Sequence, residues 1–377
     1  MTSERLMAVD RVGPQGVARL AAAGVAIFGV GAIGWWLAQL LVSLFGRVIL
    51  LDRGVVEPAN LGVQGFQEID LGLSKVSARR RALQHLNRDC RIDIFHGDVR
   101  DLGLGAFGHV DLAFVAFDSR AARVVANQFM LRRALPWIDL AVDGSGRSLI
   151  GRAAAHAPDG GCYLCSRDAA DLAAIMRENS AGCPAWSWGR AGEVESPTRS
   201  IPSLAAAVAG IGVTMGVRMF LDGPADVAGR EVLIDLGRDA HSLHRLRRNP
   251  NCLADHRAFR LTPAARATVW QTFRDAAAIV GEPVSLELQR RGIAGAIRCP
   301  ECRQERRPYK LLDAIAPGEG ECACGTVMQP VAGLVLDSFT IEQAAPFLSH
   351  TWDQLGLPPA DVVVARGPER EADLCLI

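Results

Sequence analysis

The sequence predicts an α/β fold with a doubly wound, mostly parallel sheet, followed by a small C-terminal α+β module. Three observations favour this fold. Apolar, β-branched runs of strand length alternate with helix-length segments through the first 260 residues. The first run ends in three closely spaced glycines, and the second ends in an aspartate eighteen residues beyond the last of them. Past residue 260 the composition changes and a helix precedes two close cysteine pairs. We therefore expect one domain over residues 1–260 and a second over 261–377.

The first elements form a strand, turn, helix and strand. Val25 to Val30 predicts a buried strand, Ile33 to Phe45 a helix, and Arg47 to Asp52 a second strand. The run from Leu20 to Gly46 has no charged side chain and is long enough to cross a bilayer. Its glycines would weaken a membrane helix, however, and no basic cluster flanks it. We predict sheet core and a nucleotide-binding turn, with no membrane association.

The later elements continue the alternation. Strands are predicted at residues 91–96, 110–117, 135–140 and 231–236, and helices at 74–87, 120–133, 201–221 and 263–279. Residues 166–200 break the pattern, because they are polar and contain two tryptophans. We expect this segment to form a crossover loop, and residues 334–377 to form the α+β tail.

Composition limits the classes of function. Lys+Arg and Asp+Glu both number 41, so no overall charge favours a nucleic-acid partner. The basic runs Arg79–Arg81 and Arg245–Arg248 are predicted to be solvated. The first residues carry acids and no apolar core, so no signal peptide is expected. Ten cysteines, several in close pairs, indicate zinc sites rather than secreted disulfides, and hence a reducing, cytoplasmic compartment.

A nucleotide-binding turn is indicated by the spacing of Gly29, Gly31, Gly34 and Asp52. In such units the glycines permit a tight turn and close backbone approach, and the helix N-terminus faces phosphate. The acid accepts a hydrogen bond from a ribose hydroxyl. Service in an ordinary turn is the plainer alternative for Asp52. Enzymes that use NAD, FAD, SAM or ATP share the pattern, so these residues alone leave the ligand open.

Motifs beyond Asp52 narrow the choice. They are Asn60-Leu-Gly-Val-Gln64, Gly72-Leu-Ser-Lys75, Asp118 with Arg123 and Asn127, Cys162-Tyr-Leu-Cys165 and Asn249-Pro-Asn-Cys252. In this order they resemble the ThiF/MoeB-like superfamily, the adenylating enzymes related to ubiquitin-activating enzyme, over about residues 5–256. The resemblance implies a Rossmann-like sheet that binds ATP and Mg²⁺. It also implies adenylation of the C-terminal carboxylate of a ubiquitin-like protein or a peptide.

The resemblance further implies roles for individual side chains. Lys75 would lie on the phosphates, where a compact ammonium suits a shifting negative charge. Asp118 would hold magnesium as a hard oxygen ligand, and Asn60 and Gln64 would line the pocket. Arg5 would reach into the site of a partner subunit, which implies a homodimer with composite sites. The plainer alternatives are a solvated surface position for Lys75 and a helix cap for Asp118.

One position departs from the family pattern. The family usually has an arginine immediately before Gln64, where it contacts phosphate, and here the residue is Val63. The site loses one positive group. Either Arg5 and Lys75 suffice, or the chain is a catalytically silent scaffold subunit. We favour activity, because the other pocket positions are filled.

Two constellations predict structural zinc. In the family, a Cys-x-x-Cys after the sheet joins a later cysteine pair. Cys162, Cys165 and Cys252 fit, but one cysteine is missing. His256 is the natural replacement because imidazole binds zinc well, and Asp255 is the less favoured one. The second set has the spacing of a zinc ribbon and comprises Cys299, Cys302, Cys322 and Cys324.

Three cysteines remain. Cys90 is expected to fill space between a helix and a strand, and Cys375 to lie in the C-terminal strand. Cys183 lies in the crossover loop, where related enzymes place a cysteine that forms a thioester or a persulfide. A thiolate attacks an acyl-adenylate readily, and a loop can carry it to the site. We expect Cys183 to be catalytic; a thiol packed by Trp186 and Trp188 is the alternative.

These observations predict ATP-dependent adenylation of a β-grasp, ubiquitin-like protein, followed by thioester transfer to Cys183. The C-terminal module could receive a conjugating enzyme, as in similar bacterial proteins that act beside conjugation and deconjugation partners; a role in phage defence follows by analogy alone. Alternatives are a sulfur-carrier adenylyltransferase, a peptide-modifying adenylase and a silent scaffold. An NAD oxidoreductase is a further alternative, but Lys75 and Asp118 would have no work in hydride transfer.

Overall fold

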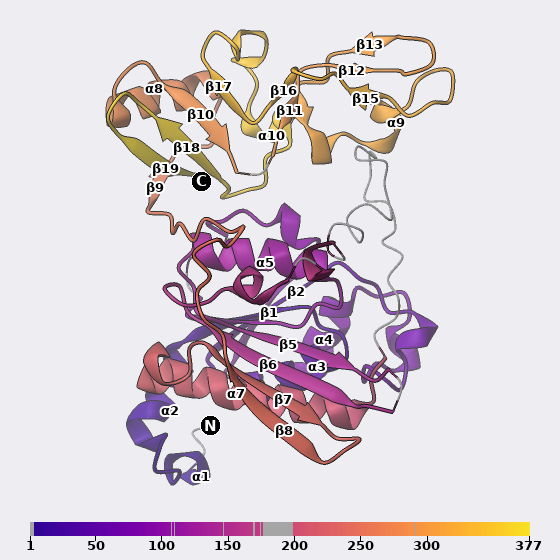
Figure 1. The fold of residues 1–377 in the computed structure, drawn as a ribbon, viewed down its shortest axis with the longest axis vertical. Helices are drawn as coiled ribbons and strands as arrows, with labels where there is room; N and C mark the ends of the chain where they lie inside the picture. Colours follow the sequence, from indigo (N-terminus) through magenta and orange to yellow (C-terminus); the bar gives the residue numbers. More distant parts are fainter. Residues whose placement is uncertain are drawn as a thin grey trace. The chain divides into compact units, whose positions relative to one another are not determined.

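The computed structural model describes residues 4–106, 108, 110–145, 147–168, 170–173, 175, 199–289 and 291–377 (Figure 1). These residues divide into two compact units. The first holds the described residues up to Arg100, from 110 to Ile175 and from 199 to Ala258. The second holds those of Asp101–Gly108 and those from Phe259 onward. Each unit has its own apolar core.

An eight-stranded sheet forms the centre of the first unit (Figure 1). Its order is β3-β2-β1-β4-β5-β6-β7-β8. The first five strands are parallel, and the last three are added antiparallel. The chain order reverses where β2 and β4 flank β1, and ligands of such sheets bind at the carboxyl ends beside that point. The strands are β1 (Gly24–Phe28), β2 (Arg47–Asp52), β3 (Arg91–His96), β4 (Leu112–Val115), β5 (Trp137–Asp143), β6 (Ile150–His156), β7 (Arg230–Asp235) and β8 (Ala240–Arg245).

Helices cover both faces of this sheet. α3 packs against α7 and α4, and α5 lies on the other face (Figure 1). Among the described residues, α7 alone has the length and hydropathy of a membrane span, but its apolar side chains pack on β5 and β6 in the core. The helices are α1 (Glu4–Met7), α2 (Gly13–Ala22), α3 (Ala32–Val42), α4 (Lys75–Leu83), α5 (Arg120–Arg132) and α7 (Pro202–Asp222).

The predicted α/β fold is confirmed, and the predicted strands and helices up to β5 appear in order with ends that differ by a few residues. Two strands of the eight-stranded sheet escaped prediction. β6 is rich in glycine and alanine rather than β-branched residues, because α7 packs closely on it: a Cβ on Gly151 would collide with Val208. β8 is exposed along its whole length and lacks an apolar run. The helix predicted from residue 263 begins only at Val269, since residues 261–264 form a strand.

The second unit contains one five-stranded sheet and two three-stranded ones. The larger has the order β17-β10-β18-β19-β9, and α8 packs on β18 and β19. The smaller sheets are β14-β11-β16 and β13-β12-β15. The elements are β9 (Leu261–Ala264), α8 (Val269–Val280), β10 (Ser285–Leu288), β11 (Ile293–Ala294), β12 (Ile297–Arg298), β13 (Glu305–Arg306), β14 (Lys310–Leu311), α9 (Pro317–Gly320), β15 (Gln329–Pro330), β16 (Val335–Leu336), β17 (Ser338–Thr340), α10 (Trp352–Leu355), β18 (Val362–Arg366) and β19 (Glu371–Leu376).

A short segment between β3 and β4 belongs to the second unit. Gly105 N donates to the Ala360 carbonyl oxygen at 2.7 Å, and Leu104 N donates to Asp361 Oδ1 at 3.4 Å. The described residues of the second unit thus come from two stretches of chain that are distant in sequence, whereas the predicted boundary at residue 260 divides the chain at a single point.

Candidate active site and metal centres

The glycine turn lies between β1 and α3 at the carboxyl edge of the sheet. Gly29 has a φ of +92°, and a Cβ there would lie 2.8 Å from the carbonyl oxygen of Ala116. A Cβ on Gly34 would collide with the Gly29 carbonyl, so both positions require glycine. Gly31 is the N-cap of α3, and the atom nearest to a Cβ there is Gln64 Oε1 at 3.6 Å. The first N–H groups of α3 therefore lie beside a polar side chain, in the arrangement that favours anions.

Asp52 fixes the turn. It ends β2, where its Oδ2 accepts a hydrogen bond from Val30 N at 2.8 Å and its Oδ1 accepts from Gly54 N at 2.7 Å. The carboxylate thus performs the turn role given above as the plainer alternative. Each of its oxygens keeps a second lone pair. The ribose contact remains compatible with this geometry and stays a prediction.

Lys75 lies beside Asp52. It is the first residue of α4, and a Cβ on Gly54 would be 3.0 Å from Asp52 Oδ1 and 3.2 Å from Lys75 Cδ and Cε. Its side chain is half-buried, and its ammonium pairs with no carboxylate in the described part of the chain. Lys75 is one of only two lysines, whereas lysines and arginines together number 41. Where the chain otherwise uses arginine, this position carries a compact ammonium on a flexible stem.

Asn60 and Gln64 lie in the loop between β2 and α4. Asn60 ends a short 3-10 helix (Pro58–Asn60), and its Oδ1 accepts from Glu57 N at 3.0 Å. Gln64 N donates to the Asn60 carbonyl oxygen at 3.1 Å. The buried Gln64 Oε1 has no hydrogen-bond partner among the described residues, so it can accept from a ligand. Asn60 shapes the loop, whereas Gln64 turns its side chain toward the glycines. Val63 is 38% exposed.

Asp118 follows β4, whose carboxyl end adjoins that of β1. Its side chain is exposed, and its Oδ1 accepts from Ser119 N at 3.1 Å. Ser119 caps α5 by accepting from Ala122 N at 3.2 Å. The capping role considered for Asp118 is thus performed by its neighbour. An exposed carboxylate at this edge has the free oxygen lone pairs that magnesium requires, so the residue fits its predicted role.

The glycine turn, Asp52, Lys75 and Asp118 are therefore brought to the edge of the sheet at which β1 lies between β2 and β4. Two predicted site residues are not placed by the structure. Cys183 lies outside the described residues. Arg5 lies in α1, and its side chain is not among those described.

A buried charge network supports the chain just beyond β4. Arg123 of α5 donates to the Phe117 carbonyl oxygen and to Asp139 Oδ1. Arg152 of β6 donates to Asp139 Oδ2 and, at 2.7 Å, to Glu231 Oε1 of β7. Two arginines balance two carboxylates, and Asp139 is fully buried. Of these four residues, the sequence motifs contained only Arg123. The sequence marks the other three residues only as charged side chains within strands, one each in β5, β6 and β7.

Arg79 is a further residue whose place in the structure the sequence did not predict. It was predicted to be solvated together with Arg80 and Arg81, and those two are exposed. Arg79 itself is only 1% exposed, so its prediction was wrong. The available signal was its position four residues after Lys75, because that spacing places both side chains on one face of α4.

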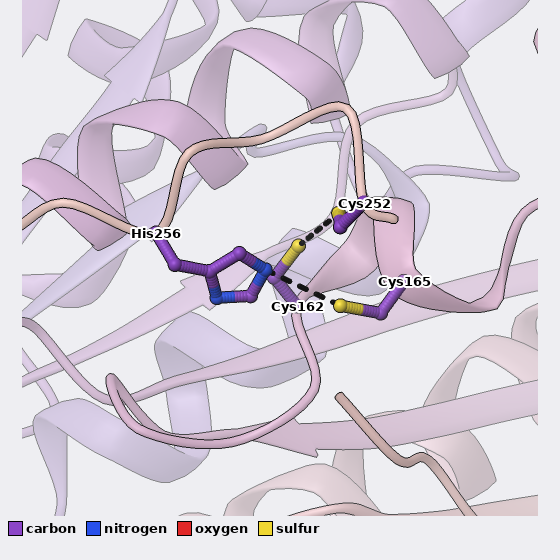
Figure 2. A group of neighbouring side chains, drawn as sticks. All are labelled: Cys162, Cys165, Cys252 and His256. Carbon is purple, nitrogen blue, oxygen red and sulfur yellow. Dashed lines mark hydrogen bonds between the residues drawn. The ribbon is translucent and has the colours of Figure 1, made fainter. Parts of the chain in front are cut away.

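The first cysteine cluster contains Cys162, Cys165, Cys252 and His256, whose ligand atoms all lie within 4.8 Å of one another (Figure 2). Cys162 Sγ is 3.7 Å from Cys252 Sγ, and Cys165 Sγ is 3.3 Å from His256 Nε2. A tetrahedral zinc ion with thiolate bonds of about 2.3 Å needs ligand atoms about 3.8 Å apart. Asp255 instead accepts from Arg132 at 2.8 and 2.6 Å, so His256 is the fourth candidate ligand.

The electrostatics of this cluster favour a cation. Burial and the neighbouring thiols raise the pKa of Cys162 to about 12, so without a counter-charge the thiol is protonated. A divalent ion would stabilise the thiolates. Burial and Arg248 lower the pKa of His256, which keeps its imidazole in the neutral form that binds metal.

The second cluster lies in the smaller sheets of the second unit. Cys299 Sγ is 3.5 Å from Cys324 Sγ, and Cys302 Sγ is 3.3 Å from Cys322 Sγ. All four sulfur atoms lie within 4.8 Å of one another, and none of these cysteines forms a disulfide. Four converging thiols at this spacing can hold zinc tetrahedrally. The predicted grouping of these cysteines is confirmed; zinc itself stays a prediction.

Comparison with known proteins adds a family and a fold. The ThiF family model matches residues 3–254. Ubiquitin-like modifier-activating enzyme 5 of Caenorhabditis briggsae is 32% identical over 153 residues, which are 37% of this chain and 35% of that protein. The Bombyx mori enzyme of the same name is 29% identical over 177 residues, 43% of this chain and 44% of that protein. The chain thus spans less than half the length of these curated relatives.

Among solved structures, Escherichia coli MccB with MccA-N7isoASN is similar with a TM-score of 0.51. The two chains are 21% identical, and the match covers 64% of this chain and 71% of the other. A likeness at this identity is evidence for the fold alone.

Proposed function

The chain belongs to the ThiF family, and from that premise we propose that it is an ATP-dependent adenylyltransferase acting on the C-terminal carboxylate of a ubiquitin-like protein. The observation that carries this proposal is the convergence of the glycine turn, Asp52, Lys75 and Asp118 at one edge of the sheet. Relatives named as ubiquitin-like modifier-activating enzymes support the class of substrate.

In the proposed reaction, a carboxylate oxygen of the substrate bonds to the α-phosphorus of ATP, and the bond to the bridging oxygen breaks to release pyrophosphate. Negative charge shifts along the phosphates as this happens, and preorganised positive groups lower its energy. The first N–H groups of α3 supply a fixed dipole, and the Lys75 ammonium follows the moving charge. Bound magnesium, held by Asp118, would neutralise phosphate oxygens.

ATP–pyrophosphate exchange with candidate ubiquitin-like proteins tests the proposal. We expect Lys75→Ala to lower the exchange rate by about 100-fold or more, because a cation over the phosphates is lost. Lys310→Ala is the matched control: it removes the only other lysine, which pairs with Glu319 in the second unit. Exchange at the wild-type rate in Lys75→Ala would refute the site. Exchange with peptides but not with ubiquitin-like proteins would identify a peptide-modifying adenylase instead.

We further propose that Cys183 receives the acyl group. Its thiolate would attack the carbonyl carbon of the acyl-adenylate, forming a C–S bond while the C–O bond to AMP breaks. Cys183→Ala should keep pyrophosphate exchange and lose the thiol-sensitive adduct, and survival of that adduct would exclude Cys183 as the nucleophile. A sulfur-carrier enzyme would use the same pocket but would need a separate sulfur donor, and it would leave a thiocarboxylate on its carrier protein, which the mass of the carrier distinguishes.

The proposal extends to assembly and location. We propose that both cysteine clusters hold structural zinc. We also propose a homodimer in which Arg5 of one subunit reaches the site of its partner. The location we propose is the cytoplasm, where thiols stay reduced. The second unit would receive a conjugating enzyme. Sedimentation of the full chain tests the dimer, and a monomer at assay concentration would remove Arg5 from the mechanism.

A further inference from the structure

Arg79 lies directly behind the glycine turn. Its guanidinium carbon is 4.4 Å from the ring centroid of Trp35 and 3.6 Å from that of Phe66, so the group is held between two aromatic faces. Within the described part of the chain, its N–H groups donate only to backbone carbonyl oxygens of the turn and of the loop after β2. The acceptors are Val30 at 3.2 Å for Nε, Gly65 at 3.3 Å for Nη1, and Gly31 at 3.5 Å with Gln64 for Nη2.

The guanidinium of Arg79 forms no ion pair with a described residue, although the charges of Asp70 and Asp52 act on it from a distance. In the described part of the chain no carboxylate pairs with its guanidinium: Asp70 bonds Arg81, and Asp52 bonds the backbone. A buried cation without a paired anion is costly. Burial lowers the pKa of Arg79 to about 9, while Asp70 and Asp52 raise it from a distance. The group is still charged at neutral pH, so a positive charge that no carboxylate of the described residues pairs directly lies beneath the turn.

The hydrogen bonds also set the direction of the turn's peptide groups. In a trans peptide the C=O and N–H point in opposite directions. Since the guanidinium binds the carbonyls of Val30 and Gly31, the N–H groups of Gly31 and Ala32 point away from it. They point toward the side from which a phosphate would approach the N-terminus of α3.

We propose that Arg79 is a positioning residue of the nucleotide site, whose buried charge is neutralised by the phosphates of the bound nucleotide. This inference rests on the proposed function. Arg79 supplies, from behind the turn, a positive charge at a site where Val63 supplies none. It acts through the backbone that it orients and through its electric field, without touching the phosphates.

Calorimetric titration of the full chain with ATP and with adenosine tests the proposal, because only a charge effect depends on the phosphates. Arg79→Met should weaken ATP binding about tenfold or more beyond any loss in adenosine binding. Arg80→Met, which removes the same charge from the exposed neighbour, should leave both affinities within about twofold. Arg79→Lys keeps the charge without the planar fork. It should weaken both ligands but keep the wild-type ratio of ATP to adenosine affinity.

The outcomes separate this proposal from the proposed function. If wild type binds ATP and Arg79→Met weakens ATP and adenosine equally, Arg79 only packs, and the proposal fails while the function stands. Should Arg79→Met not fold, Arg79→Lys decides: a collapsed ratio of ATP to adenosine affinity contradicts the charge effect. A wild-type chain that binds no ATP would overturn both.

Discussion

At the residue scale, α4 brings two different cations to the glycine turn. Lys75 and Arg79 lie one helical turn apart on the same face. The guanidinium is fixed by carbonyl oxygens and two aromatic rings, so its charge stays in one place. The ammonium stands on a flexible stem with no carboxylate partner in the described chain, so it can follow charge that moves. The two residue types thus suit a fixed and a mobile role at the proposed phosphate site.

His156 makes the stability of the first unit sensitive to acid. Its ring stacks on Trp137 at 4.4 Å, its Nδ1 donates to the Gly161 carbonyl oxygen at 2.7 Å, and burial lowers its pKa to about 3. The unfolded chain binds this proton near pH 6.5, whereas the folded chain does not until about pH 3. Stability is therefore lost as the pH falls through this range.

We expect a loss of about 2 kcal/mol between pH 7 and pH 5 that is attributable to His156. His156→Asn can still donate to Gly161 but cannot be protonated, so it should show a smaller drop over that interval in urea unfolding. His241→Asn, on the exposed strand β8, is the control and should behave like wild type. The same drop in His156→Asn as in wild type would show that this imidazole is not the acid-sensitive group.

At the scale of elements, α5 connects the candidate active site to the first cysteine cluster. Its N-terminal end follows Asp118. Asn127 Oδ1 accepts from Tyr163 N at 2.9 Å, beside one pair of cysteines, and Arg132 bonds Asp255 beside His256. Both ligand-bearing loops are thus attached to the same helix. Metal binding there would fix the helix that carries the active-site edge, the usual task of a closed structural site.

Metal content tests the ligand set. We expect two zinc ions per chain by elemental mass spectrometry, one for each cluster. Cys252→Ala and His256→Ala should each reduce the content to one. Asp255→Ala should keep two, because Asp255 pairs with Arg132. Loss of zinc in Asp255→Ala with retention in His256→Ala would reverse the ligand assignment.

The network across β5, β6 and β7 predicts unequal costs for removing its members. Among the described residues, Arg152→Met leaves the buried Asp139 with one cation and Glu231 with none, and should cost about 3–5 kcal/mol in the free energy of unfolding. Glu231→Gln leaves Arg152 paired with Asp139 and should cost only about 1 kcal/mol. Urea unfolding measures both variants. Equal costs would mean that these charges do not act as one network.

At the scale of the whole molecule, the sequence predicts those elements that have a simple local pattern, such as an apolar run for a buried strand or spaced glycines for a tight turn. The positions of Gly29 and Asp52 were therefore predicted from the strand and glycine pattern, and that of Lys75 from the family resemblance. The burial of Arg79 was not predicted, because a run of three arginines favours a solvated helix face, and only its spacing of four residues from Lys75 distinguishes it from Arg80 and Arg81. Arg152 and its two partners lie on three different strands, and only the tertiary fold brings them together.

The central claim is that the phosphates of ATP lie across the glycine turn against Lys75. The chain allows a direct test, because Lys75 and Lys310 are its only lysines. The rate of acylation of each ammonium by an amine-reactive ester can be followed by mass spectrometry, with and without saturating ATP. We expect ATP, but not adenosine, to protect Lys75 while Lys310 reacts unchanged. Equal labelling of Lys75 with and without bound ATP would contradict it.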